Sequence, residues 1–140
     1  MLYKVEVRQV PARSIAVVRG QATKVNLPAR IRALFDEFYA GFQGQGGLNI
    51  VLYPGDVAGE FEIECGVEIE NGGNSSTPAG MVATTTYMGP YAQMGGAHKA
   101  IHQSVGDSGR KLAGPSWELY GHWNDDPAKL RTDIFYLLAG

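Results

Sequence analysis

The sequence predicts an α+β fold made of two β-α-β-β modules that are related by a pseudo-twofold axis. Three observations lead to this expectation. Each half of the chain shows hydrophobic patterns in the order strand, helix, strand, strand. "PARSIA" (11–16) resembles "PAGMVA" (78–83) at an offset of 67 residues, which also pairs Leu52 with Leu119 and Tyr53 with Tyr120. The polar connector "NGGNSSTP" (71–78) is too short to separate independent domains.

The first half supplies three predicted strands and a helix after a leading segment. "YKVEVRQV" (3–10) and "RSIAVVRG" (13–20) are rich in β-branched residues and are typical of paired strands. "LPARIRALFDEFYAGF" (27–42) has apolar residues at helical spacing, Pro28 near its first turn and Gly44 beyond its end. "LNIVLY" (48–53) is a short strand that ends at Pro54-Gly55.

The segment "EFEIECGVEIE" (60–70) alternates between apolar residues and glutamates, which is the pattern of a half-buried strand. Its glutamates are expected to form a solvated face, and the alternative is that they concentrate cations near a cleft. Cys65 lies on the apolar face and is interpreted as inert core. The glutamates concerned are Glu60, Glu62, Glu64, Glu68 and Glu70.

The second half repeats this order with a weaker helix. "AGMVATTTYMG" (79–89) predicts a strand, and "SWELYGHW" (116–123) and "RTDIFYLL" (131–138) predict the two closing strands. "YAQMGGAHKAIHQSV" (91–105) predicts a helix that two glycines interrupt. We therefore expect one domain over residues 1–140, with the repeat at roughly 3–70 and 78–138. Its antiparallel sheet system would carry both helices on one side and a concave cleft on the other.

Composition excludes several classes of protein. The 140 residues, 44% hydrophobic and 19% charged, are ordinary for a soluble globular domain. A net charge of −2 argues against a nucleic-acid-binding protein. One cysteine excludes an internal disulfide and a cysteine-rich zinc site. No apolar run approaches the roughly 20 residues of a membrane span, and the N-terminus is unlike a signal peptide, so we expect a cytoplasmic location without membrane contact.

Glu118 is the residue whose orientation decides the function. Side chains alternate on a strand, so Glu118 and Tyr120 share one face while Trp117 and Leu119 share the other. We expect Trp117 and Leu119 beneath the helices and Glu118 and Tyr120 in the cleft. The repeat places Val51 and Tyr53 at the matching positions of the first half. The alternative is that Glu118 is an exposed strand residue.

Four further aromatic residues are candidates for the walls of this cleft. Tyr87 and Tyr91 flank Gly89-Pro90, a turn that precedes the second helix and from which a tyrosine can overhang the cleft. Trp123 and Phe135 lie near the closing strands. These four complete the candidate ligand-binding set of Glu118, Tyr120, Tyr53, Tyr91, Tyr87, Val51, Trp123 and Phe135.

No motif indicates a cofactor or a metal. His98 and His102 have the i, i+4 spacing that can hold a metal, but no third ligand is evident, so a solvated helix face is favoured. A phosphate loop, a dinucleotide fingerprint and a nucleophile elbow are absent from the sequence. We expect no cofactor and no metal.

The strings "PAGMVATTTYMGPY", "GPSWELY" and "TDIFYLL" together resemble the GyrI-like small-molecule-binding domain over essentially the whole chain. That domain is also the effector-binding module of AraC-type and MerR-type multidrug-responsive regulators. The resemblance implies two modules around an aromatic cleft, in which a glutamate matching Glu118 contacts cationic lipophilic ligands. The chain looks like a free-standing member without a helix-turn-helix, so direct binding to nucleic acid is not expected. A homodimer or a protein partner stays open.

The leading hypothesis is a stand-alone sensor or sequestration module for cationic or amphipathic lipophilic molecules. A binding protein is favoured over an enzyme. The resemblance also implies an alternative, a hydrolase of cyclopropanoid DNA-alkylating natural products. In it Glu118 activates water and Tyr120 or Tyr91 donates a hydrogen bond. A second alternative is an inhibitor protein that acts on a DNA-processing enzyme.

Overall fold

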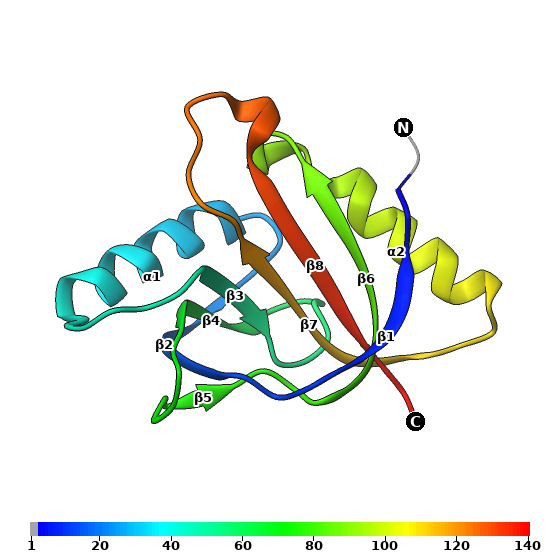
Figure 1. Ribbon diagram of the computed structural model, residues 1–140, viewed down its shortest axis with the longest axis horizontal. Helices are drawn as coiled ribbons and strands as arrows, with labels where there is room; N and C mark the ends of the chain where they lie inside the picture. Colours follow the sequence, from blue (N-terminus) through cyan, green and yellow to red (C-terminus); the bar gives the residue numbers. More distant parts are fainter. Residues whose placement is uncertain (1–2) are drawn as a thin grey trace.

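The computed structural model describes residues 3–140, which form one eight-stranded antiparallel sheet and two α-helices (Figure 1). The helices are α1 (Leu27–Gly41) and α2 (Gly95–Asp107), and short 3₁₀ turns lie at Tyr91–Gln93 and Pro127–Lys129. The strands are β1 (Glu6–Val10), β2 (Ser14–Ala22), β3 (Asn49–Tyr53), β4 (Phe61–Glu68), β5 (Ser75–Ser76), β6 (Gly80–Met88), β7 (Leu112–Tyr120) and β8 (Arg131–Leu138).

The strand order β1-β6-β8-β7-β3-β4-β2-β5 is symmetric about its centre. β2-α1-β3-β4 forms one module and β6-α2-β7-β8 the other, and the modules meet where β3 pairs with β7. In that pairing Val51 lies opposite Glu118, and these residues are also 67 positions apart. The pseudo-twofold axis therefore passes between Val51 and Glu118. β1 and β5 are exchanged, since β1 precedes β2 but pairs with β6, and β5 precedes β6 but pairs with β2.

Both helices lie on the same face of the sheet, as the sequence predicts. α1 packs on β2 and β4, and α2 packs on β6 and β8. Leu34 and Phe38 are the buried residues of α1, and Ala97, Ile101 and Val105 are those of α2. The apolar face of each helix thus packs against the sheet. The glycines that were expected to interrupt the second helix, Gly95 and Gly96, instead lie at its start.

The prediction that Trp117 and Leu119 lie beneath the helices is wrong. They face away from them, and Trp117 stacks on Phe135 with ring centroids 5.3 Å apart. The sheet curls, so this face closes over an apolar cluster of its own and needs no helix to cover it. The buried members of that cluster are Ile15, Val17, Ile50, Leu52, Val82, Trp117 and Phe135.

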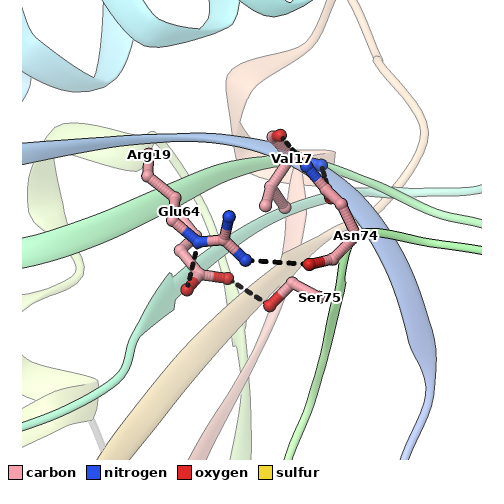
Figure 2. Close-up of polar contacts among 5 residues, drawn as sticks. All are labelled: Val17, Arg19, Glu64, Asn74 and Ser75. Carbon is pink, nitrogen blue, oxygen red and sulfur yellow. Dashed lines mark hydrogen bonds and ion pairs between the residues drawn. The ribbon is translucent and has the colours of Figure 1, made fainter.

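One glutamate of β4 departs from the solvated face that alternation predicts. Glu62 is exposed, but Glu64 is buried at 7% relative exposure. Its carboxylate accepts from Arg19 Nε at 3.3 Å and from the Ser75 hydroxyl (Figure 2). The reason is that the connector folds back as β5 along β2 and covers this position. A buried carboxylate with two donors is a structural tie rather than a collector of cations.

Asn74 fastens the connector to β2 next to this ion pair. Its Oδ1 accepts from the Val17 N–H at 3.0 Å, and its Nδ2 donates to the Val17 carbonyl at 2.9 Å (Figure 2). The side-chain amide thereby pairs with β2 as a strand residue would. Arg19 Nη2 donates to the Asn74 carbonyl at 2.8 Å, which joins the amide to the Arg19–Glu64 pair.

We expect Asn74→Ala to lower the free energy of unfolding by about 1–3 kcal/mol, because a backbone N–H and carbonyl of β2 lose their partners. Urea denaturation measures the change. Asn71→Ala, at an exposed position of the same connector, is the matched control and should change stability by no more than about 0.5 kcal/mol. Equal effects in the two variants would contradict the role given to Asn74.

Candidate functional site

A cavity of about 460 Å³ lies on the helix side of the sheet, between the start of α1 and the side of α2. This volume falls within the usual range for small-molecule sites, about 300–1,000 Å³. Strand residues of β3, β7 and β8 form part of its lining. The rest comes from the turn before α1, the loop after β3 and both helices. The lining residues are Lys24, Leu27, Tyr53, Asp56, Val57, His98, His102, Leu112, Gly114, Ser116, Glu118 and Tyr136.

Glu118 lies in the lining of this cavity and is only 5% exposed. The Tyr120 hydroxyl donates to its Oε1 at 2.6 Å, and His98 Nε2 lies 2.6 Å from its Oε2. Both carboxylate oxygens therefore have a partner, which compensates the cost of removing the group from water. The exposed-strand alternative for Glu118 does not fit this burial.

The hydrogen-bonded chain continues beyond Glu118 into α2 and β8. His98 Nδ1 lies 2.7 Å from the Tyr136 hydroxyl, so both ring nitrogens of His98 are engaged. The edge of Tyr136 also meets His102, with ring centroids 4.8 Å apart. Tyr120, Glu118, His98 and Tyr136 thus form one continuous polar chain, which links β7 to α2 and β8.

Burial and the charge of Glu118 together raise the pKa values of the neighbouring phenol and thiol groups. Burial first, and the Glu118 carboxylate second, raise the pKa of Tyr136 to about 12 and that of Cys65 to about 12. The same two causes raise the pKa values of Tyr53 and Tyr120 well above the ordinary tyrosine value. The phenols therefore keep their protons at neutral pH and are available as hydrogen-bond donors.

The remaining lining is amphipathic. Leu27, Val57 and Leu112 provide apolar surface, and Lys24 and Asp56 are its other charged side chains. These two charges offset each other, so Glu118 leaves the lining with one net negative charge when both histidines are neutral. Burial, and then the neighbouring His98, lower the pKa of His102.

Four of the sequence-derived candidates lie in or next to the region of Glu118. Tyr53 shares the cavity lining with Glu118. Tyr120 contacts Glu118 through its hydroxyl, and its ring meets Tyr91 edge-on at 5.2 Å between centroids. Tyr91 is 37% exposed, just outside the lining residues. Val51 is fully buried opposite Glu118 and supports the floor without reaching the cavity.

Three other candidates lie away from the cavity. Tyr87 is buried in the cluster beneath α2, where its hydroxyl donates to the Pro90 carbonyl at 2.8 Å, so it fastens the turn. Phe135 stacks on Trp117 on the opposite face of the sheet. Trp123 is 72% exposed because β7 ends at Tyr120 and not at residue 123.

The structure adds three residues that sequence reasoning missed: His98, His102 and Tyr136. The sequence favours a solvated helix face for His98 and His102, but both line the cavity. The available signal was their position beside the apolar stripe of Ala97 and Ile101, and in the structure His98 faces the centre of the sheet at β7 and β8. Tyr136 and Phe135 are neighbours on β8 and face opposite sides of the sheet. The prediction of Phe135 as a cleft residue is wrong, because Tyr136 lines the cavity instead.

A metal centre is not formed by these histidines alone. Across residues 3–140 no group of three or more histidine, cysteine, aspartate or glutamate side chains is placed to hold a metal ion. Within the same residues no helix is long and apolar enough to cross a membrane.

Comparison with solved structures finds proteins of similar fold over essentially the whole length of the chain. No protein-family model matches the chain, and no curated protein matches its sequence. The C-terminal domain of EcmrR is similar in structure, with a TM-score of 0.76, 22% sequence identity and 99% of each chain covered. SAV2435 bound to tetraphenylphosphonium has a TM-score of 0.74 at 12% identity, covering 100% of this chain and 95% of its own. A hydrolase from Listeria innocua has a TM-score of 0.61 at 11% identity, covering 97% and 92%. At these identities the likeness establishes the fold.

Proposed function

We propose that this chain, which has the GyrI-like effector-binding fold, binds cationic or amphipathic lipophilic small molecules in the cavity over Glu118. The observation that carries the proposal is a buried carboxylate in the wall of a cavity of about 460 Å³. The protein would act as a sensor or sequestration module, with Glu118 as the anionic anchor.

The chemistry of the lining supports a cationic ligand. An ionised carboxylate offers about four lone-pair positions, and Tyr120 and His98 occupy two of them. A cation gains from the negative charge without displacing either partner. The rings of Tyr53 and Tyr136 add dispersion and cation–π contacts of about 0.5–2 kcal/mol each. Few directional contacts are required, so a broad range of ligands is expected.

A structural neighbour is consistent with this class of ligand. SAV2435, with the same fold, is bound to tetraphenylphosphonium, a lipophilic cation. We extend that chemistry to this chain on the strength of its own carboxylate and aromatic lining, and not on sequence identity.

The test is calorimetric titration with a matched pair of ligands, methyltriphenylphosphonium and triphenylphosphine oxide. The two compounds share three phenyl rings on phosphorus and differ in charge. We expect the cation to bind at least ten times more tightly than the neutral oxide, since one charge-assisted contact contributes about 1.5–3 kcal/mol. Equal affinities would rule out Glu118 as an anchor for cations.

Removal of one hydroxyl next to the anchor should have a smaller effect. In Tyr120→Phe the ring remains against Tyr91, but Oε1 of Glu118 loses its donor. We expect the affinity for methyltriphenylphosphonium to fall by about 0.5–1.5 kcal/mol, measured by the same titration. Tyr39→Phe, on the exposed side of α1, is the control and should leave the affinity unchanged.

A second candidate function is hydrolysis. Glu118 belongs to a chain that includes a histidine and two tyrosines, an array able to hold and transfer protons at the cavity wall. A hydrolase from Listeria innocua also shares the fold. Incubation with cyclopropane-bearing electrophiles, followed by product analysis, tests for turnover. Formation of hydrolysed product by the wild type and not by Glu118→Gln would favour an enzyme.

A further inference from the structure

His98 of α2 contacts the Glu118 carboxylate, which is also the group proposed to bind a cationic ligand. Its Nε2 lies 2.6 Å from Glu118, its Nδ1 lies 2.7 Å from the Tyr136 hydroxyl, and the ring lines the cavity. An incoming cation thus meets a carboxylate that already has an imidazole beside it.

This geometry keeps both ring nitrogens of His98 hydrogen-bonded in two protonation states. With a neutral imidazole, Nε2–H donates to Glu118 and the Tyr136 hydroxyl donates to Nδ1. With an imidazolium, Nδ1–H donates to the Tyr136 oxygen, and the hydroxyl hydrogen of Tyr136 turns toward the cavity that this side chain lines. Loss of the Nδ1 proton requires only the rotation of one hydroxyl, and every hydrogen bond of the chain persists.

We propose that His98 is a specificity-determining residue of this site. When a cationic ligand binds, the Glu118–His98 pair releases a proton to solvent. The inference rests on the proposed function, namely that the cavity binds cations. The Nδ1–H bond breaks, its electron pair stays on nitrogen, and the proton passes to water or buffer. The net charge of the pair changes from 0 to −1, the state that attracts a cation.

The direction of the pH dependence follows from linkage. If binding a cation expels a proton, raising the pH strengthens binding, by at most tenfold per pH unit for one proton. A neutral ligand of the same shape gains little from the charge change, so its affinity should vary much less. The site would then discriminate between cationic and neutral molecules more strongly at higher pH.

The contribution of His98 to proton release must be distinguished from that of the other titratable groups around it. The tyrosines and Cys65 have raised pKa values, and Glu118 is the partner itself. His102, on the same helix, has a lowered pKa and is the competing source of a proton. The charged and titratable groups facing this site are Glu118 and Tyr120 from β7, Tyr136 from β8, Tyr53 from β3, Cys65 from β4, His102 from α2, and Lys24 and Asp56 from the cavity lining.

The experiment is a proton inventory by calorimetry with methyltriphenylphosphonium, from about pH 5 to pH 8, the range in which imidazoles titrate. Titrations in two buffers of different ionisation enthalpy give the number of protons released per ligand bound. The probe has no titratable proton, so any released proton comes from the protein. We expect the wild type to release up to one proton over part of this range, with affinity that rises with pH, and triphenylphosphine oxide to release much less.

Two variants identify the source. In His98→Gln, the amide can still donate to Glu118 but carries no titratable proton, so we expect no proton release and an affinity that is independent of pH. In His102→Gln the release should persist. Release that disappears in His102→Gln and not in His98→Gln overturns the inference, as does cation binding by the wild type with no proton release at any pH. The latter result leaves the proposed function standing, whereas absence of cation binding at every pH overturns both. Even if a variant fails to fold, cation binding by the wild type without proton release overturns the inference.

Discussion

Glu118→Gln is expected to weaken binding of a cationic ligand by about ten- to hundredfold, equivalent to about 1.5–3 kcal/mol. The substitution keeps the shape of the side chain and removes its charge. The amide oxygen can still accept from Tyr120, and the amide nitrogen can donate to His98 Nε2 while His98 Nδ1–H donates to Tyr136. The chain of hydrogen bonds is retained, so the loss reports the charge and not a collapsed site.

The measurement is titration of wild type and variant with methyltriphenylphosphonium and triphenylphosphine oxide. The neutral compound should lose much less affinity than the cation. Glu68→Gln, on a half-buried carboxylate away from the cavity lining, controls for a change in net charge alone and should preserve the difference between the two ligands. Equal losses for both ligands in Glu118→Gln would mean that the carboxylate acts only through the fold.

Gly66→Ala is expected to destabilise the protein by about 3 kcal/mol or more, the largest effect on stability that we expect for a single methyl group. Gly66 lies in β4 opposite Val17 of β2. A Cβ at this position would lie 1.8 Å from the carbonyl oxygen of Ala16 and 2.8 Å from Val17 Cα. Both are backbone atoms, so β2 and β4 would have to move apart. Urea denaturation, or loss of soluble folded protein, measures the effect.

Gly106→Ala is the matched control. Gly106 lies in α2, and a Cβ there would meet no atom within 4 Å. Because alanine has a higher helix propensity than glycine, we expect this variant to be about 0.5–1 kcal/mol more stable. A loss of stability in Gly66→Ala no larger than 1 kcal/mol would show that β2 and β4 can separate without breaking their pairing.

The pattern of the sequence predicts the fold to a large extent because its periodicities are local. The alternation over 60–70, the apolar spacing over 27–42 and the order of elements in each half all match the structure. The motifs "GPSWELY" and "TDIFYLL" led to the GyrI-like effector-binding fold, which the structural comparisons confirm. Local patterns fix which residues share a face, so Glu118 and Tyr120 were correctly placed on one side of their strand.

Local patterns do not determine which face of the sheet packs against the helices. The polar chain through Glu118 lies under the helices because the curled sheet covers Trp117 and Phe135 itself, and no periodicity of single strands encodes that curl. The pairing of β7 with β8 sets Phe135 opposite Trp117, so Tyr136 and not Phe135 lies on the face of the cavity, and the sequence of β8 alone does not encode this register. The contact of His98 with Glu118 depends on how α2 is docked, which requires the folded structure.

The pseudo-twofold axis between Val51 and Glu118 constrains which residues the two halves can carry at this shared position. If both halves kept the same residue at this position, two carboxylates would face each other as a directly opposed cross-strand pair, about 4.5–5.5 Å apart at Cβ, and like charges there are destabilising. An acidic residue in one copy and an apolar residue in the other avoids this repulsion. Val51 opposite Glu118 is such a pair, and it leaves a single carboxylate at the axis.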